Sequence, residues 1–248
     1  MPSRLALCCC LVVVLWAALW LGCGQALGAA AAVSRWQVVL VAGDNAQPVF
    51  DNAIEALGHW LTERGVAPAD IHRLSAKRGP RDPAIEPASA VRILQRIAAL
   101  APRPGEGCLV FITSHGKKGA GIHLASSAEY LQPASLAQAL SIGCGAAPTA
   151  VIVSACFSGA FTAGAMRAPN RIILSAARSD RPSFGCQADR TYTVFDECLL
   201  AAMPRAPTWR AVYDQSRGCV REREREMSVL PSQPQASFGA AVRDLAVR

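Results

Sequence analysis

The sequence predicts an α/β fold of three layers, in which helices cover both faces of a mostly parallel sheet. Two observations lead to this class. Residues 36–42, 108–113 and 149–155 are short apolar runs between turn residues, as in strands that are buried on both faces. Segments with apolar residues at helical spacing separate these runs, which is typical of parallel strands joined by helices. The length of 248 residues suits one domain with a sizeable core.

The chain after the first strand continues the same alternation. Residues 48–64 carry an apolar residue every three or four positions, which predicts a helix that Gly65 ends. Residues 71–74 form a short candidate strand, followed by a polar loop. Pro87 suits the first turn of a second helix. We expect the apolar face of that helix at Val91, Leu94, Ile97 and Leu100.

The second half of the chain is predicted to complete the sheet and its helical cover. Thr208 is the expected N-cap of the last helix. For the tail, residues 228–248, a closing strand and a flexible cover are both open alternatives. The other expected elements are a hairpin arm at 122–124, a helix at 133–140, a strand at 171–176, and helices at 195–203 and 208–227.

The N-terminus has the pattern of a secretory signal peptide over residues 1–28. A short positive start precedes residues 5–21, which carry no charge, and small residues place a cleavage site near 28–31. The alternatives are an uncleaved membrane anchor and lipidation at Cys23. Each of them implies export, to the periplasm or the medium, and leaves residues 33–248 as the folded domain.

Export changes how the cysteines are interpreted. Six lie beyond the leader, and in an oxidising compartment some of them should pair. If Cys156 is free, at least one more is unpaired, and the sequence does not give the pairing. No spacing typical of a zinc site occurs, so we expect no metal. The six are Cys108, Cys144, Cys156, Cys186, Cys198 and Cys219.

Two predicted strands end in a chemically reactive side chain, His115 in one case and Cys156 in the other. The carboxyl ends of parallel strands share one edge of a sheet, and neighbouring strands lie about 5 Å apart. A nearby imidazolium or helix N-terminus lowers the pKa of a thiol, and the small residues after Cys156 favour a helix start there. We predict Cys156 as nucleophile, His115 as its proton acceptor, and the backbone N–H groups of Gly116 and Cys156 as an oxyanion hole.

These motifs resemble those of a known family. Residues 113–116 (Thr-Ser-His-Gly) and 154–159 (Ser-Ala-Cys-Phe-Ser-Gly) resemble the His-Gly and Ala-Cys motifs of the legumain-like cysteine peptidases. Residues 41–45 are similar to the end of the first legumain strand. Those enzymes share the caspase–haemoglobinase fold with the caspases and with the catalytic subunit of GPI transamidase. The resemblance spans residues 36–186 and implies that fold here.

The substrate pocket is where this chain departs from that family. Legumains carry an Asn and then an Arg-His pair behind the first strand, where this sequence has Val49 and Asp51. Asn specificity is therefore not carried over. Ser175 and Asp180 lie in a segment similar to the lining of the family's substrate cleft, so the resemblance implies that they and Asp51 contact the substrate. Acidic side chains here, Asp44 among them, favour a basic or neutral P1 residue.

The sequence therefore predicts a cysteine endopeptidase that works through a Cys–His dyad and an acyl-enzyme intermediate. Its expected partner is a peptide or protein substrate, without a metal or organic cofactor. The net charge of +7 comes from scattered arginines, so we expect no nucleic-acid partner. Membrane attachment is expected only through an uncleaved leader or a lipidated Cys23. The alternatives are a transamidase or ligase with the same dyad, and an inactive exported binding protein of the same fold.

Overall fold

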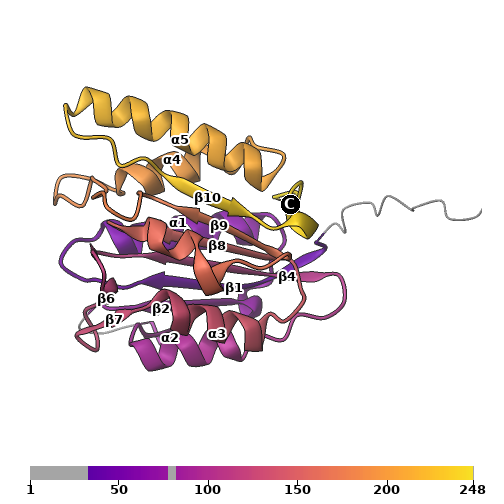
Figure 1. Cartoon of the computed structure of the whole chain (residues 1–248). Helices are drawn as coiled ribbons and strands as arrows, with labels where there is room; N and C mark the ends of the chain where they lie inside the picture. The colour runs from indigo at the N-terminus through magenta and orange to yellow at the C-terminus, as the bar shows by residue number, and fades with distance from the viewer. Residues whose placement is uncertain (1–32, 78–81, 248) are drawn as a thin grey trace, which may run out of the picture.

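A seven-stranded sheet forms the centre of the protein (Figure 1). The computed structural model describes residues 33–77 and 82–247. Neighbouring strands are parallel, except that β10 pairs antiparallel with β9. In spatial order the strands are β10 (Gln235–Phe238), β9 (Arg171–Ser175), β8 (Thr149–Ser154), β4 (Glu106–Thr113), β1 (Arg35–Ala42), β2 (Ile71–Ser75) and β3 (Ile85–Pro87).

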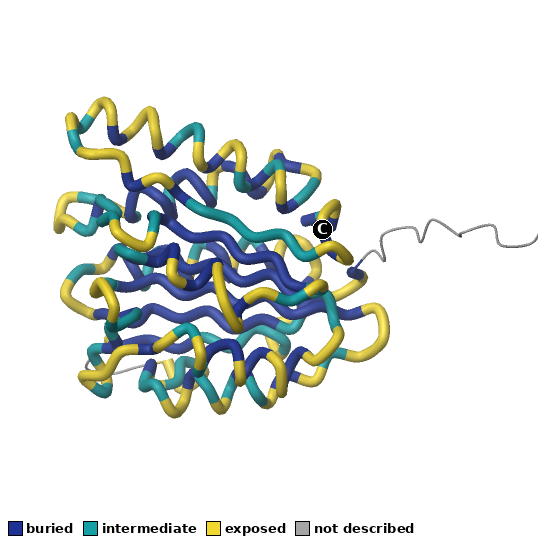
Figure 2. Tube along the Cα trace, viewed as in Figure 1, coloured by how far each residue is buried: buried dark blue, intermediate teal, exposed yellow. Residues whose placement is uncertain are grey.

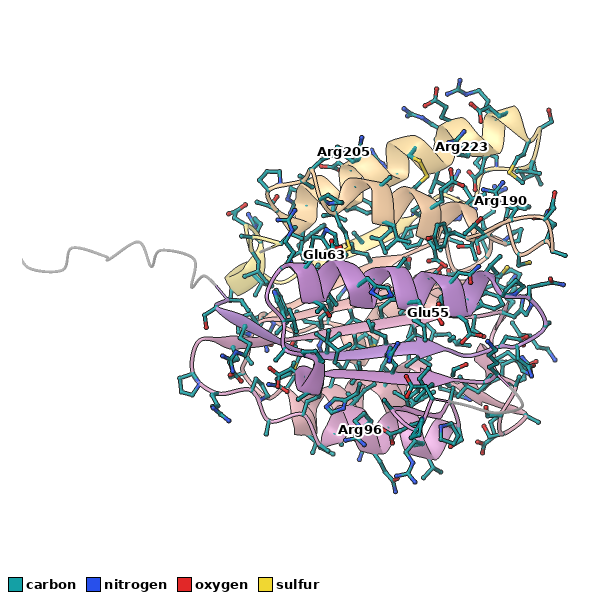
Figure 3. The ribbon with its side chains drawn as sticks, turned by 180° about the vertical axis from the view of Figure 1, so that it is seen from behind. Glu55, Glu63, Arg96, Arg190, Arg205 and Arg223 are labelled. Carbon is teal, nitrogen blue, oxygen red and sulfur yellow. A yellow bond between two sulfur atoms is a disulfide. The ribbon has the colours of Figure 1, made fainter. Side chains whose placement is uncertain are left out.

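Helices cover both faces of this sheet. One face packs against α1 and α4 and the other against α2 and α3, while α5 lies on the outside of α4 (Figures 1 and 3). The three layers that the sequence predicts are therefore confirmed. The helices are α1 (Val49–Glu63), α2 (Ala90–Ala98), α3 (Pro133–Gly143), α4 (Val194–Ala202) and α5 (Trp209–Glu226).

Two apolar layers join the sheet to its helices. Successive residues of a strand point to opposite faces, so β1 contributes Val38 and Leu40 to the layer under α1 and α4. The same strand contributes Val39 and Val41 to the opposite layer. All eight residues of β4 and all six of β8 are buried (Figure 2). Burial of each Val, Leu or Ile side chain stabilises the fold by about 1.5–3 kcal/mol. The strands β4 and β8 therefore hold the residues that follow them in fixed positions.

A small antiparallel sheet stands beside the end of β4. It consists of β5 (Gly116–Lys117), β6 (Gly121–Leu124) and β7 (Glu129–Leu131). The predicted hairpin arm is thus the middle strand of three, and β6 and β7 lie at the left of Figure 1. The backbone of β6 is joined to the segment that follows β4, because the His123 N–H donates to the carbonyl oxygen of His115 at 2.9 Å.

Three details differ from the sequence-based expectation. Pro87 ends the short strand β3, and α2 begins after it with Ser89 as its N-cap. The buried residues of α2 are Ile93 and Ile97. Of the four residues expected to be buried, Ile97 and Leu100 are, whereas Val91 is 61% exposed. The tail contributes β10, so part of it is the closing strand of the two alternatives.

Two disulfides tie helices to their neighbours. Cys108–Cys144 joins β4 to the residue after α3, and Cys198–Cys219 joins α4 to α5. Their Cα–Cα distances of 6.0 and 5.7 Å are ordinary for a disulfide. Within the described ranges, Cys156 and Cys186 are free. The expectation that a second cysteine stays unpaired beside Cys156 is confirmed.

The predicted leader, its cleavage site and Cys23 lie outside the described residues. Among the helices that the structure describes, none is long and apolar enough to cross a bilayer. The folded part that is described begins at Val33, where the chain enters β1 through a hydrogen bond from the Ser34 N–H to the carbonyl oxygen of Gly105, 2.8 Å long.

Candidate active site

The register of β4 and β8 brings the two predicted catalytic residues to one place. Thr113 and Ser154 are the last register pair of these parallel strands, and His115 and Cys156 each follow two residues later. Both side chains line one narrow cavity of about 10 Å³ at the carboxyl edge of the sheet, a volume comparable with a single water molecule. The other lining residues are Phe50, Ser114, Ser154, Ser183, Phe184, Cys186 and Thr193.

Cys156 is held by the loop that follows β9. The Ser183 N–H donates to the Cys156 sulfur at 3.2 Å, and the thiol donates to the carbonyl oxygen of Ser183 at 3.4 Å. The next residue, Phe157, has a φ of 60° and donates its N–H to the carbonyl oxygen of Arg181 at 2.8 Å. This turn presents the thiol at the cavity instead of continuing the strand.

The helix predicted behind Cys156 is only a short 3₁₀ helix, Ser158–Thr162. Its five residues are too few for the aligned peptide dipoles of a full α-helix to build up. The nearby N–H donor therefore comes from Ser183 in the following loop. Sequence reasoning missed this residue, because nothing in the local pattern of a loop shows which strand end it approaches.

His115 is positioned by packing. Its ring meets the edge of Phe50 from α1, with ring centroids 5.2 Å apart and planes at 79°. Within the described part of the chain the imidazole has no hydrogen-bond partner, so both nitrogens are available to the thiol and to a substrate. The Asn that legumains carry near this histidine is replaced by Val49, which is buried at the start of α1.

Gly116 lies directly against the backbone of Cys156. A Cβ atom built on Gly116 would overlap the Cys156 carbonyl group and would lie 3.2 Å from its nitrogen. Only glycine lets the two chain segments approach so closely. The N–H groups predicted to form an oxyanion hole therefore belong to two backbone segments that are in contact.

A buried carboxyl group lies behind the cavity wall. Asp196, in the first turn of α4, is 0% exposed, and its Oδ2 atom accepts a hydrogen bond from the Thr113 hydroxyl at 2.7 Å. Burial raises the pKa of Asp196 to about 6, although hydrogen bonds from Ser154, Thr113 and Thr193 act in the opposite direction. Sequence reasoning missed this residue. Its one signal was the pattern Thr193-x-x-Asp196, which is typical of a helix capping box.

Cys186 is the second thiol at the cavity. Burial raises its pKa, and the nearby Cys156 raises it further. A thiol with a raised pKa stays protonated and unreactive near neutral pH. Of the two thiols, the Cys156 sulfur is the one that receives the Ser183 N–H.

The residues predicted to contact the substrate lie outside the cavity. Ser175 is 0% exposed, and its hydroxyl donates to the backbone carbonyls of Ala177 and Gln235. Asp51 accepts a hydrogen bond from Ser75 at 2.6 Å. In this structure Ser175 has no surface to offer a substrate.

The two other acidic residues considered for the P1 pocket each have a partner. Asp180 binds Arg178 through two hydrogen bonds, one of 2.8 Å, and this contact lowers the pKa of Asp180 to about 2. Asp44 pairs with the ring of His123 at 2.8 Å. Each of these carboxylates thus has a hydrogen-bonding partner within the fold.

Comparisons with known proteins agree with this geometry. The model of the Peptidase C13 family matches residues 91–210, a range that includes His115, Gly116 and Cys156. No curated protein matches the chain. Among solved structures, caspase-1 from Spodoptera frugiperda matches with a TM-score of 0.57 and 15% sequence identity, over 84% of this chain and 88% of that one. The caspase likeness shows the fold, and the match to the Peptidase C13 family model supports a legumain-like cysteine peptidase.

Proposed function

We propose that the protein is an endopeptidase in which Cys156 and His115 form the catalytic dyad. The observation that carries this proposal is the shared cavity: the thiol and the imidazole line one recess at the ends of neighbouring parallel strands. Ser183 directs an N–H group at the sulfur from the other side. A base within reach and a donor to the anion are the two features that activate a cysteine nucleophile.

In the proposed reaction, the thiol proton moves to His115 and the Cys156 sulfur attacks the scissile carbonyl carbon. The carbonyl oxygen becomes an anion that the N–H groups of Gly116 and Cys156 stabilise. When the C–N bond breaks, His115 returns the proton to the leaving amine and a thioester remains. A water molecule then gives a proton to His115 and attacks the thioester, which releases the carboxylic acid and restores the thiol.

A peptide acyloxymethyl ketone, which alkylates an activated cysteine, tests the nucleophile. We expect one label on the full-length protein, located at Cys156 by peptide mass spectrometry, and none on Cys156→Ala. A fluorogenic peptide panel gives activity and specificity together. His115→Ala should lower kcat at least 100-fold, whereas His59→Ala, an exposed histidine of α1, serves as the matched control.

The proposal fails if no label appears between pH 5 and 8, or if it appears on Cys186. Adding an amine-bearing peptide separates hydrolysis from transamidation, because a transamidase would pass the acyl group to that amine in place of water. An endopeptidase gives only the free acid. A preference for cleavage after Asn would contradict the departure from legumain specificity that Val49 and Asp51 indicate.

We also propose that the protein is exported. Two disulfides, one in each helical layer, support an oxidising compartment, in agreement with the leader pattern of residues 1–28. Fractionation of cells that express the full chain, with N-terminal mass analysis, tests this. A soluble cytosolic protein that keeps residues 1–28 would contradict it, and a mass increase at Cys23 would identify lipidation.

A further inference from the structure

The carboxyl group of Asp196 lies in the interior without a charged partner. Its Oδ2 atom accepts from the Thr113 hydroxyl, and in the described part of the chain its Oδ1 atom has no hydrogen-bond partner at all. An unpartnered carboxylate oxygen in the interior costs free energy. α4 itself does not need this oxygen, because the Thr193 side chain already caps the helix by accepting from the Asp196 N–H at 3.1 Å. The position of the carboxyl group therefore points to a role outside its own helix.

Asp196 touches the two strands exactly where they lead into the dyad residues. Thr113 precedes His115 by two positions and Ser154 precedes Cys156 by two positions, and these two residues are register partners. Ser154 also approaches Thr193, with 3.5 Å between the hydroxyl oxygens. Ser154 and Thr193 in turn line the cavity. The carboxyl group thus accepts from Thr113 and lies beside Ser154 and Thr193, behind the wall that separates α4 from the reacting groups.

We propose that Asp196 is a positioning residue for the dyad: its carboxylate ties the ends of β4 and β8 to α4 and so fixes the spacing of His115 and Cys156. The inference rests on the proposed roles of those two residues. Asp196 does not itself line the cavity, so its effect is transmitted through the hydroxyls of Thr113, Ser154 and Thr193.

Protonation would rearrange these contacts. An ionised carboxylate only accepts hydrogen bonds, so all three hydroxyls can point at it. A carboxylic acid must also donate, so one hydroxyl has to turn and accept, which changes the wall of the cavity. The raised pKa of Asp196, about 6, places this change in mildly acidic solution.

No charged group contributes to that pKa, whose causes are burial and the three hydroxyls. The nearest acidic neighbour on α4, Glu197, points outward and binds Arg190 at 2.6 Å and Arg223 at 3.0 Å; Figure 3 shows both arginines at this end of the molecule. Titratable groups on the elements around Asp196 include His115 after β4, Cys156 after β8, Cys186 in the preceding loop, Asp51 on α1, Glu197 on α4 and Glu224 on α5.

Asp196→Asn tests the inference with little change of shape, and Asp214→Asn, an exposed site on α5, is the matched control. We expect kcat of Asp196→Asn to fall at least tenfold at pH 7.5 with KM within twofold. The step near pH 6 in the wild-type profile of log kcat should disappear. Thr113→Val should lower kcat likewise, and Thr113→Ser, which keeps the hydroxyl, should restore it.

A second readout needs no peptide substrate. The rate at which iodoacetamide alkylates Cys156, followed by peptide mass spectrometry from pH 5 to 8, should lose the same step in Asp196→Asn and keep it in Asp214→Asn. If Cys156→Ala remains an active peptidase, the proposed dyad is wrong, whatever Asp196 does. If Asp196→Asn and Thr113→Val keep the wild-type kcat and both pH profiles, Asp196 is only structural and the inference is overturned. Should Asp196→Asn not fold, Thr113→Val and Thr113→Ser decide alone.

Discussion

At the scale of single residues, the approach of two backbone segments defines the site. Gly116 and Cys156 are in contact because the glycine has no side chain. His115, one residue earlier, is fixed by its edge-on contact with Phe50 and by the backbone hydrogen bond from His123. The dyad therefore depends on packing on both sides of the histidine, with no side-chain hydrogen bond to its ring in the described structure.

Gly116→Ala should inactivate the enzyme with little effect on the rest of the fold. The added methyl group overlaps the Cys156 carbonyl, and a displacement of about 1 Å in a catalytic site can cost about 100-fold in rate. We expect kcat/KM to fall by that factor. Gly218→Ala is the matched control, because a Cβ there meets no atom within 4 Å, and it should stabilise α5 by about 0.5–1 kcal/mol. Wild-type activity in Gly116→Ala would contradict the contact.

Asp196 should make the stability of the fold depend on pH. Its pKa rises from the ordinary value of 3.8 to about 6 in the fold, so between these pH values the folded state holds a proton that the unfolded state has lost. Stability is therefore fully present below pH 3.8 and decreases as the pH rises through 6, by about 3 kcal/mol. Asp196→Asn lacks this decrease.

Urea unfolding of the wild type and of Asp196→Asn at pH 4 and pH 7.5 measures the effect. The free energy of unfolding of the variant, relative to the wild type, should increase by about 3 kcal/mol between the two pH values. Asp214→Asn should show no such increase. If the free energies of unfolding of Asp196→Asn and the wild type differ by the same amount at both pH values, Asp196 does not titrate in this range.

At the scale of elements, α4 and α5 form a unit that supports the site from one face. The Cys198–Cys219 disulfide joins them, and Arg223 of α5 binds Glu197 of α4 at 3.0 Å. Because Asp196 lies in the first turn of α4, the placement of this helix pair bears on the cavity as well as on stability.

Removing this disulfide should cost both stability and activity. The bond closes a segment with a sequence separation of 21 residues, for which chain entropy gives about 3 kcal/mol. We expect Cys198→Ala/Cys219→Ala to lose about that free energy of unfolding, and kcat to fall through the shift of α4. The corresponding double variant of Cys108 and Cys144, on the other face, should lose stability with a smaller effect on kcat. If kcat fell more in the Cys108 and Cys144 variant than in Cys198→Ala/Cys219→Ala, α4 would not have the proposed role in positioning the site.

The sequence was most informative where hydrophobic periodicity is strong. β1, β4, β8 and β9 are apolar runs, and their ends could be located closely enough to pair His115 with Cys156 before the structure was known. β3 was not predicted and β10 was only one of two alternatives for the tail, since Ile85–Pro87 is too short and Gln235–Phe238 has no apolar run. Edge strands are exposed on one side, so they carry a weaker hydrophobic pattern.

The pocket was less predictable than the dyad. Two of the acidic residues expected to face the substrate find a partner from a distant part of the chain, Asp51 in Ser75 and Asp44 in His123. A sequence pattern does not reveal such long-range pairs. Asp196 was not predicted, for a related reason. Its capping-box spacing predicts an exposed helix start, whereas the first turn of α4 is buried behind β4 and β8.

At the scale of the whole molecule, the cysteines of the described residues divide into a disulfide-bonded set and a free set. Four form the two disulfides that hold the helical layers, and the two free thiols both face the cavity. A chain that lacks the predicted leader, unfolded without reductant, should therefore titrate with two thiols. The free thiols should be mapped to Cys156 and Cys186. Any other number, or a label at Cys108, would contradict the pairing.

The strand β10 has a consequence for how the protein is made. It comes from the last part of the chain, yet it covers the edge of β9 beside the loop that holds Cys156, and the Arg178 N–H donates to the carbonyl oxygen of Ser232. A nascent chain that has reached residue 230 already contains the dyad but presents β9 as an open edge, which is a template for aggregation. A chain truncated before residue 235 lacks the strand that covers β9, so such products should be insoluble as well as inactive.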